Sequence, residues 1–290
     1  MTKRILIFNP SARGEKSRKL RHLLDLQAGS GVTLAETRAP GDGQRLAAQA
    51  VADGCDLVIA AGGDGTINEV INGLGTSGIT LAVMPVGTVN VFARELGIPL
   101  KPRLAWEVIE RGATRTIDLA AAESAGQRRL FVQLAGVGLD ATAVLLASWE
   151  LKKRIGPMSY VWAGLQTLAR PQVIVEVWTD RPQPRGRGAA VLIGNGRFYG
   201  GPFPVFPQAR LDDGLLDVCI FHQHRYWDMI RYGQGIVRGV HTSFADVTYF
   251  QATTFECRSP AAPFQLDGES AGTGPVRFSV VPRALRVIAP

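Results

Sequence analysis

The stretch Leu57-Val-Ile-Ala-Ala-Gly-Gly-Asp-Gly-Thr-Ile-Asn-Glu69 combines a short apolar run, a glycine-rich turn and the start of an amphipathic segment. We predict a buried strand over Leu57–Ala61 and a helix from near Thr66, because short apolar runs bounded by glycines are typical of parallel-sheet strands. Glycines lack a Cβ, so backbone N–H groups can approach phosphate oxygens there, and the helix N-terminus adds a partial positive charge. The stretch therefore predicts a strand-helix unit with a phosphate-binding loop.

This loop departs from two familiar phosphate-binding patterns. No Gly-Lys-Ser/Thr follows it, so it is not a Walker A loop, and it lacks the G-x-G-x-x-G spacing of a dinucleotide fingerprint. The carboxylate of Asp64 would repel a polyphosphate unless it binds a divalent cation or holds a hydroxyl group or a water molecule. A tight glycine turn with a solvent-exposed Asp64 is the alternative.

Two further loops of similar design are predicted beside the first. Pro85-Val-Gly-Thr-Val-Asn90 follows the predicted strand Thr80–Met84, and Asn9 follows the predicted strand Arg4–Phe8. Because the carboxyl ends of parallel strands lie at one edge of a sheet, where ligands normally bind, we expect these loops to form one nucleotide-binding crevice. For Asn9, a simple turn-forming role is the alternative.

Apolar runs alternate with amphipathic stretches in residues 1–120, which predicts an α/β domain with a mostly parallel sheet. Residues 121–290 form a predicted β-rich domain, whose last strand could return to the first domain. The expected helices are Glu15–Leu26, Gln44–Ala52, Thr66–Leu74, Thr88–Leu96 and Arg103–Arg111, with helical insertions at Leu139–Ala169 and Arg225–Gly239. The expected later strands are Thr116–Ala121, Leu130–Leu134, Val173–Thr179, Ala189–Ile193, Leu215–Phe221, Thr253–Arg258, Pro263–Leu266 and Val276–Val281.

Composition sets bounds on the class of protein. The chain of 290 residues is 46% apolar and 20% charged, so disordered and collagen-like chains are excluded. Its three scattered cysteines and the short apolar run at its start predict a cytoplasmic protein without an export signal. The net charge of +7 favours phosphates or anionic membrane surfaces, and no motif supports a nucleic-acid partner. Because no apolar run approaches about 18 residues, membrane contact would be peripheral.

Four motifs together resemble one family. They are Asn9-Pro, Gly62-Gly-Asp-Gly-Thr66 with Asn68-Glu69, Gly87-Thr88-x-Asn90 and Asp267-Gly-Glu269. In this order they are similar to the diacylglycerol kinase catalytic family, which includes bacterial soluble lipid kinases and is related to the sphingosine and ceramide kinases. The resemblance implies an N-terminal α/β domain like that of NAD kinases and phosphofructokinases, which binds ATP. It also implies a C-terminal β-sandwich that carries a lipid pocket.

The resemblance implies an ATP-dependent, Mg²⁺-requiring kinase of a primary hydroxyl on diacylglycerol, phosphatidylglycerol, or a sphingoid or ceramide lipid. It implies that Glu269 is the general base, and we group Asp267 and Asp64 with it as catalytic residues. From the residues alone, Phe264–Leu266 is a short strand that delivers Glu269 at its end, and a plain hairpin turn is the alternative. The predicted cofactor-binding residues are Asn9, Thr37, Gly62, Gly63, Asp64, Gly65, Thr66, Ile67, Asn68, Glu69, Gly87, Thr88 and Asn90.

A second acidic cluster lies in Arg210-Leu-Asp-Asp-Gly-Leu215. From the residues alone, Asp-Asp-Gly before a strand is an ordinary turn. The loop resembles a structural Mg²⁺ site of the family, which implies that Asp213 supplies a carboxylate and that Arg210 and Leu215 supply backbone carbonyls. Hard oxygen ligands of this kind suit Mg²⁺. The upstream segment Asn195–Gly201 resembles a glycine-rich loop of the family and is expected to line the cleft.

Two departures from the family pattern leave alternatives open. Val91 stands where related lipid kinases often carry Asp, and Pro202 replaces a glycine. The class of lipid is therefore undecided. A kinase of a soluble acceptor such as NAD is one alternative. A nucleotide- or lipid-binding sensor with degraded chemistry is the other.

The predicted partner is a lipid substrate at a membrane surface, contacted peripherally, and a homodimer is an open possibility. Lys152–Trp162 is the preferred membrane-contacting segment, because basic residues beside aromatic ones suit an anionic interface. The amphipathic helix expected within Arg225–Gly239 is predicted to pack its apolar residues on the core, with a membrane face as the less favoured alternative.

Overall fold

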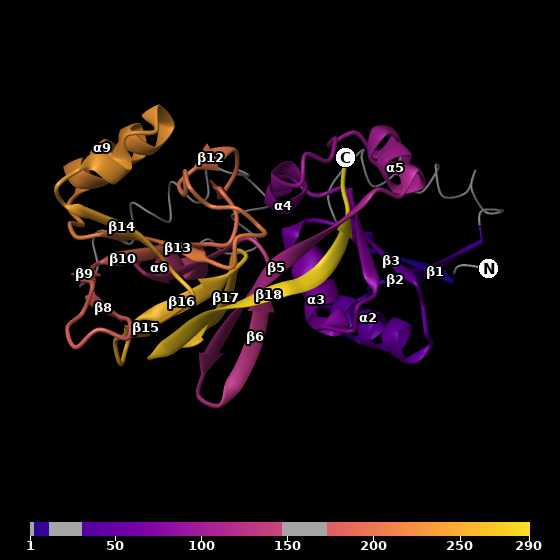
Figure 1. The fold of residues 1–290 in the computed structure, drawn as a ribbon, viewed down its shortest axis with the longest axis horizontal. Helices are drawn as coiled ribbons and strands as arrows, with labels where there is room; N and C mark the ends of the chain where they lie inside the picture. Colours follow the sequence, from indigo (N-terminus) through magenta and orange to yellow (C-terminus); the bar gives the residue numbers. More distant parts are fainter. Residues whose placement is uncertain (1–2, 12–30, 147–172) are drawn as a thin grey trace.

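A computed structural model describes residues 3–11, 31–146 and 173–290 of the chain. The N-terminal half and the C-terminal half lie side by side, and the last strand runs from one to the other (Figure 1). The helix predicted at Glu15–Leu26, the membrane segment predicted at Lys152–Trp162 and most of the helical insertion predicted at Leu139–Ala169 lie outside the described residues.

The N-terminal half alternates strands and helices, as predicted. Its elements are β1 (Arg4–Phe8), β2 (Val32–Glu36), α2 (Asp42–Ala52), β3 (Leu57–Gly62), α3 (Asp64–Leu74), β4 (Thr80–Pro85), α4 (Val91–Glu95) and α5 (Pro102–Arg111). The strand order is β2-β1-β3-β4, and each neighbouring pair is parallel. The carboxyl ends of these strands therefore lie at one edge, and the predicted α/β class is confirmed.

The C-terminal half is built mainly of antiparallel strands. Its elements are β5 (Thr114–Ser124), β6 (Gln127–Phe131), β7 (Leu134–Gly138), α6 (Leu139–Leu146), β8 (Val175–Trp178), β9 (Gly186–Gly188), β10 (Ala190–Gly194), β11 (Phe198–Tyr199), β12 (Phe203–Pro204), β13 (Leu216–Phe221), α9 (Tyr226–Arg238), the 3-10 helix η1 (His241–Ser243), β14 (Val247–Ala252), β15 (Thr254–Arg258), β16 (Pro263–Leu266), β17 (Glu269–Thr273) and β18 (Val276–Ile288). A six-stranded sheet of order β14-β13-β10-β7-β16-β17 forms one layer. Its buried side chains join those of β8, β15 and β18 in one apolar cluster, which confirms the predicted β-sandwich.

Two long strands are shared by both halves. β18 is parallel to β4, with Arg286 opposite Thr80, and antiparallel to β5 and β15. Successive residues of a strand face opposite sides of its sheet. Accordingly, Leu119 of β5 is buried in the N-terminal core, whereas Ala120 is buried in the core of the sandwich. The two apolar cores thus lie on opposite faces of the same strands.

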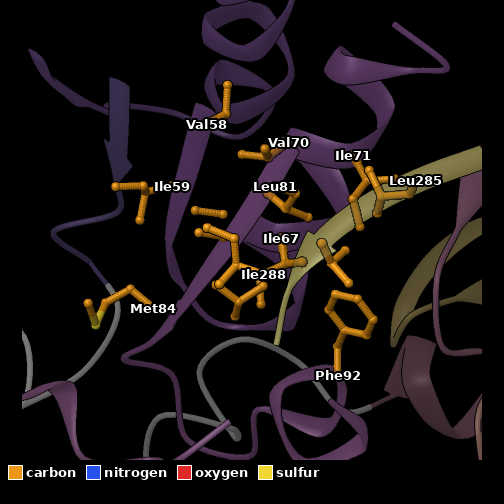
Figure 2. Packing of buried hydrophobic residues seen from close by; sticks show 14 of the residues in the cluster. Val58, Ile59, Ile67, Val70, Ile71, Leu81, Met84, Phe92, Leu285 and Ile288 are labelled. Atoms are coloured by element: carbon orange, nitrogen blue, oxygen red, sulfur yellow. The ribbon is translucent and has the colours of Figure 1, made fainter. Parts of the chain in front are cut away.

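The N-terminal core closes around α3. Figure 2 shows Ile67 and Ile71 of this helix beside Leu285 and Ile288 of β18, with Phe92 at the edge of the cluster. All five side chains are at most 4% exposed. Burying an aliphatic side chain of this size contributes about 1.5–3 kcal/mol, so this contact fixes the helix that begins at the predicted phosphate loop.

The strand predicted at Val276–Val281 continues to Ile288, and β2 and β14 were not predicted. Three further sequence predictions require correction. The strand predicted at Leu130–Leu134 is interrupted between β6 and β7, because backbone N–H groups at 132–134 donate hydrogen bonds to the Asp267 carboxylate. The helix predicted at Thr88–Leu96 is shortened to α4, because Asn90 has a left-handed backbone with φ 54°. The helix predicted from Thr66 begins at Asp64 instead.

Two helical glycines should respond in opposite ways to substitution by alanine. In α3, a Cβ on Gly73 would lie 2.2 Å from the carbonyl oxygen of Gln44 in the neighbouring helix, whereas a Cβ on Gly233 of α9 would meet nothing within 4 Å. We expect Gly233→Ala to raise the free energy of unfolding by about 0.5–1 kcal/mol. Gly73→Ala should lower it by about 1–3 kcal/mol, because the two helices must move apart.

Chemical denaturation of both variants measures this difference. Equal stabilisation by both substitutions would show that α2 and α3 do not pack as closely as described.

Candidate active site

The two predicted glycine loops lie against each other at the carboxyl edge of the parallel sheet. A Cβ on Gly87 would lie 2.4 Å from the Cα of Gly63, so the two backbones meet where a side chain would not fit. Asn90 holds the second loop, because its Oδ1 accepts from Gly87 N at 3.0 Å and its Nδ2 donates to Gly87 O at 2.8 Å. Thr88 is exposed at the tip of this loop.

The end of the first strand joins the same edge. Asn9 Nδ2 donates a hydrogen bond to Thr66 Oγ1 at 2.9 Å, so the side chain of Asn9 lies at the first turn of α3. Thr37 follows β2 and is buried, and its N–H donates to Phe8 O at 2.9 Å. The first turn of a helix presents unpaired N–H groups and a partial positive charge. The structure thus gathers Asn9, Thr37 and Thr66 beside a surface suited to phosphate.

Three residues that were predicted to bind the cofactor contribute to local packing and hydrogen bonding. The Glu69 carboxylate accepts hydrogen bonds from Gly41 N and Gly43 N, both at 2.8 Å, and so fixes the loop that leads into α2. The side chain of Ile67 lies in the N-terminal core. Asn68 is buried, and its Nδ2 donates to Leu130 O and to the carboxylate of Asp267. These side chains support the crevice from behind.

The Asp-Gly-Glu motif forms a tight hairpin between β16 and β17. Leu266 is paired with Glu269, and the two residues between them have positive φ, 47° at Asp267 and 85° at Gly268. An Asp-Gly pair is favoured in such two-residue turns, where both backbones must be left-handed. The strand, the turn and Glu269 therefore lie where the sequence predicts them. A plain hairpin turn, which was the alternative, describes the same local structure.

The Asp267 carboxylate accepts four hydrogen bonds. Its Oδ1 accepts from the N–H groups of Gln133 and Leu134, at 3.0 and 2.9 Å. Its Oδ2 accepts from Val132 N at 3.0 Å and from Asn68 Nδ2 at 2.7 Å. Burial raises the pKa of Asp267, and these hydrogen bonds act in the opposite direction. The residue anchors the hairpin to α3 and to the segment between β6 and β7.

The hairpin brings Glu269 onto the first glycine loop. A Cβ on Gly65 would lie 2.4 Å from Glu269 Oε1, so the carboxylate occupies the space that a side chain at position 65 would need. Asp64, one residue earlier, accepts a hydrogen bond from Phe92 N at 3.2 Å. Burial raises the pKa of Asp64, and the nearby negative charge of Asp267 raises it further. The predicted carboxylates of Asp64, Asp267 and Glu269 thus lie near one another at the start of α3, although Asp64 is far from the other two in the sequence.

A cavity of about 460 Å³ opens beside these carboxylates. Most of its wall is apolar and includes Val91, Phe92 and Leu134, and Phe203 stands partly exposed in the lining. The lining residues are Asp64, Val89, Val91, Phe92, Val132, Gln133, Leu134, Asp140, Ala143, Val144, Tyr199, Gly200, Phe203, Gln265, Asp267 and Gly268. Tyr199 and Gly200 belong to the glycine-rich loop that was expected to line the cleft.

A hydrogen-bonded cluster in this lining was not predicted from the sequence. Tyr199 Oη donates to the carboxylate of Asp140, and Gln265 Nε2 donates to Asp140 Oδ2 at 3.0 Å. Gln265 Oε1 accepts from Gly268 N at 2.7 Å and so supports the hairpin that carries Glu269. Burial raises the pKa of Asp140. The only sequence signal was an acidic residue directly after the apolar run at 134–139.

Glu95 at the end of α4 was also missed. Its carboxylate accepts hydrogen bonds from Arg197 N at 2.8 Å, Arg197 Nε at 3.0 Å and Gln133 Nε2 at 3.1 Å. The side chain of Glu95 is only 5% exposed. These partners are 38 and 102 residues away in the sequence, so no local pattern could reveal them. Glu95 joins α4 to the loop that carries Tyr199.

The predicted metal loop lies in the C-terminal half, outside the cavity lining. Asp213 Oδ1 accepts from Leu215 N at 3.0 Å, and the side chain of Arg210 pairs with Asp212 at 3.6 Å. Burial raises the pKa of Asp213, as do the charges of Asp118 and Asp212. No group of three or more His, Cys, Asp or Glu side chains in the described residues could hold a metal ion. A cation here would therefore depend on backbone carbonyls such as those of Arg210 and Leu215.

The described helices are all too short or too polar to cross a bilayer.

Two family models match the chain: the diacylglycerol kinase catalytic domain matches residues 3–122, and the YegS C-terminal NAD kinase beta sandwich-like domain matches residues 133–289.

Curated relatives match along nearly the whole length. A Pseudomonas aeruginosa protein named "Probable lipid kinase YegS-like" is 34% identical over 296 residues, which cover 99% of this chain and 94% of the relative. A diacylglycerol kinase of Bacillus subtilis is 32% identical, with 98% and 95% covered. A solved diacylglycerol kinase structure from Bacillus anthracis has a TM-score of 0.77 and 26% identity, and the match covers 100% of this chain and 97% of that one. The chain belongs to the diacylglycerol kinase catalytic-domain family and is a lipid kinase.

Proposed function

We propose that this lipid kinase transfers the γ-phosphoryl group of ATP to the primary hydroxyl of a lipid whose head group carries no negative charge. The observation that carries this proposal is the cavity, in which mostly apolar walls include the carboxylates of Asp64, Asp140 and Asp267. An apolar cavity with a few converging polar groups suits a lipid with one reactive hydroxyl.

ATP would lie over the two glycine loops, with its phosphates at the first turn of α3. Asn9 and Thr37 would contact it from the ends of the neighbouring strands, and the backbones of Gly63 and Gly87 would allow its close approach. Because phosphoryl transfer has a loose transition state, most catalysis would come from positioning and charge neutralisation.

Glu269 is the proposed general base. It would accept the hydroxyl proton as the lipid oxygen forms a bond to the γ-phosphorus and the bond from that phosphorus to the β–γ bridging oxygen breaks. ADP then leaves, and Glu269 remains protonated. The contact between its carboxylate and Gly65 supports this role, since it lies at the loop proposed to hold the phosphates. Gln265 would keep the hairpin in place through Gly268.

Mg²⁺ is the proposed metal, and the carboxylate of Asp64 would be a suitable ligand for it. Burial, and to a smaller extent the charge of Asp267, raise the pKa of the Asp64 carboxyl, so a divalent cation beside it would relieve an unfavourable negative charge. Bound there, Mg²⁺ would neutralise charge on the phosphate oxygens. A second, structural Mg²⁺ is proposed at Asp213, where the nearby charges of Asp118 and Asp212 would favour a cation in the same way.

We infer that the charges in the cavity would favour some lipid head groups over others. Three lining residues are Asp, and none of the described lining residues is Lys or Arg. A phosphate in the head group, about 4 Å from a carboxylate, would be repelled by about 4 kcal/mol at the effective dielectric constant of a protein site. This argument disfavours phosphatidylglycerol. It favours diacylglycerol, ceramide or a sphingoid base.

Val91 supports the same conclusion. It forms part of the apolar wall beside Asp64, where related lipid kinases often carry a further carboxylate. The cavity wall thus offers contacts to hydrocarbon. NAD, the soluble alternative, is polar along most of its length and would not use this apolar wall, which makes it the weaker candidate. Because the carboxylates of Asp64 and Glu269 are retained, a nucleotide- or lipid-binding sensor without catalytic activity is also a weaker candidate.

Replacing the proposed base tests the chemical step. We expect Glu269→Gln to lower kcat by about 10²- to 10⁴-fold and to leave ATP affinity largely unchanged, because a positioned base contributes in this range. Steady-state assays and calorimetric titration of ATP measure the two effects. Glu123→Gln, on the β5–β6 hairpin, is the matched control. Full kcat in Glu269→Gln would remove Glu269 from the role.

Replacing Asp64 tests nucleotide and metal binding. We expect Asp64→Ala to weaken binding of Mg·ATP by about tenfold or more, which is the loss typical even of residues that only support a metal ligand. The loss should be smaller for ATP measured with a chelator. Asp180→Ala, in the exposed turn after β8, serves as the control. Equal affinity of Asp64→Ala and the unmodified protein at every Mg²⁺ concentration would contradict the assignment.

A lipid panel tests the head-group argument. We expect kcat/KM for diacylglycerol, ceramide or sphingosine to exceed that for phosphatidylglycerol by at least about a hundredfold, following the repulsion estimated above. Asp140→Asn should narrow this ratio, because it removes one negative charge and keeps the shape. Transfer of γ-labelled phosphate into organic-extractable product measures each rate. Label that enters phosphatidylglycerol best, or only NAD in the aqueous phase, would refute the proposal.

A further inference from the structure

Helix α9 has apolar side chains on two opposite faces. On the inner face Tyr232 is 3% exposed and packs with Met229 and Ile236 against neighbouring strands. On the outer face Trp227 is 76% exposed and Val237 is 70% exposed. The prediction that the apolar residues of this helix pack on the core therefore holds for one face only, since the helix has more apolar residues than its single contact face can bury.

The outer face combines aromatic rings with positive charge. The rings of Tyr226 and Trp227 pack edge to face at 5.3 Å, and Tyr226 is 49% exposed. Arg225 and Arg238 are exposed at the two ends of the helix, and neither forms an ion pair within the described part of the chain. By contrast, Arg231 is paired with Asp228 and Asp246. We call Tyr226, Trp227 and Val237, with Arg225 and Arg238, the α9 surface.

Helix α9 lies next to a segment that lines the proposed lipid cavity. Helix α9 contacts β12, in which Phe203 is 45% exposed and also lines the cavity. Just after the helix, His241 Nε2 is hydrogen-bonded to Val205 O at 2.8 Å, which fixes α9 to the chain that follows β12. Figure 1 shows α9, β12 and α4 along one side of the molecule, with the β5–β6 hairpin on the opposite side.

We propose that the α9 surface docks on the anionic face of a lipid bilayer and so brings the cavity to its substrate. This inference rests on the proposed function, which requires a lipid held in a membrane. Trp and Tyr are favoured at the boundary between head groups and acyl chains, and Arg at a membrane surface is attracted by anionic lipids. The aromatic pair would enter the boundary while Arg225 and Arg238 contact lipid phosphates.

A second copy of this chain is the competing occupant of the surface. In a two-fold contact the same patch meets itself, so the arginines of both copies would be brought to one interface. Neither Arg225 nor Arg238 has a carboxylate partner on the α9 surface. Charge complementarity therefore favours an anionic bilayer.

The test measures binding of the full chain to phosphatidylcholine vesicles with and without phosphatidylserine. We expect binding only with the anionic lipid. Trp227→Ala should weaken it by about tenfold or more, as expected for an aromatic side chain that leaves an apolar environment. Arg238→Gln should weaken it by about fivefold at low salt, and this effect should vanish at high salt. The matched controls Leu34→Ala on β2 and Arg128→Gln on β6 should bind as the unmodified protein does.

Kinase assays distinguish a failure of the docking proposal from a failure of the proposed function. With a short-chain, water-soluble diacylglycerol and no vesicles, Trp227→Ala should retain full activity, whereas its activity on long-chain lipid in vesicles should fall. Equal vesicle binding by Trp227→Ala and Leu34→Ala would overturn the docking surface, whatever the activity. A dimer that dissociates on Trp227→Ala would also overturn it. Vesicle binding that depends on Trp227 in a protein inactive on every lipid would uphold docking and refute the proposed function.

Discussion

The carboxylate of Asp267 is the group on which the arrangement of the site depends. It accepts hydrogen bonds from three consecutive backbone N–H groups at 132–134 and from Asn68 of α3. Hydrogen bonds to a charged group contribute about 1.5–3 kcal/mol each, and a buried carboxylate without them would be strongly unfavourable. One side chain thus interrupts a strand, fixes the Asp-Gly turn and connects the two halves of the molecule.

The shared strands extend that connection. β5 and β18 contribute alternate side chains to the two cores and pair with each other in both halves, with a register shift between Val281 and Leu285. Glu95 adds a polar connection between α4 and the loop of Tyr199. These contacts place the carboxylate of Glu269 beside Gly65, so the proposed base lies at the proposed phosphate loop, as a reaction catalysed mainly by positioning requires.

The N-terminal half could be predicted closely, because its signals are local. The apolar run at 57–61, the glycines that follow it and the repeated strand-helix pattern are short-range features, and they give the parallel sheet and its loops. Errors arose where side chains, distant or nearby, form hydrogen bonds with the backbone. The strand expected at 130–134 lost its N–H groups to Asp267, more than 130 residues away, and Asn90 ended a helix pattern by closing a loop on Gly87.

By itself, the sequence determined the β-α units, the Asp-Gly hairpin and the family, because each depends on residue types at fixed short spacing. Only the tertiary structure decided which groups the carboxylates contact. Asp140, Tyr199 and Gln265 meet across 59 to 125 residues, and Glu69 supports a loop rather than facing the crevice. Likewise, the pattern of α9 does not say which of its two apolar faces is covered. Burial and partner choice depend on packing between distant segments, and no local pattern records that packing.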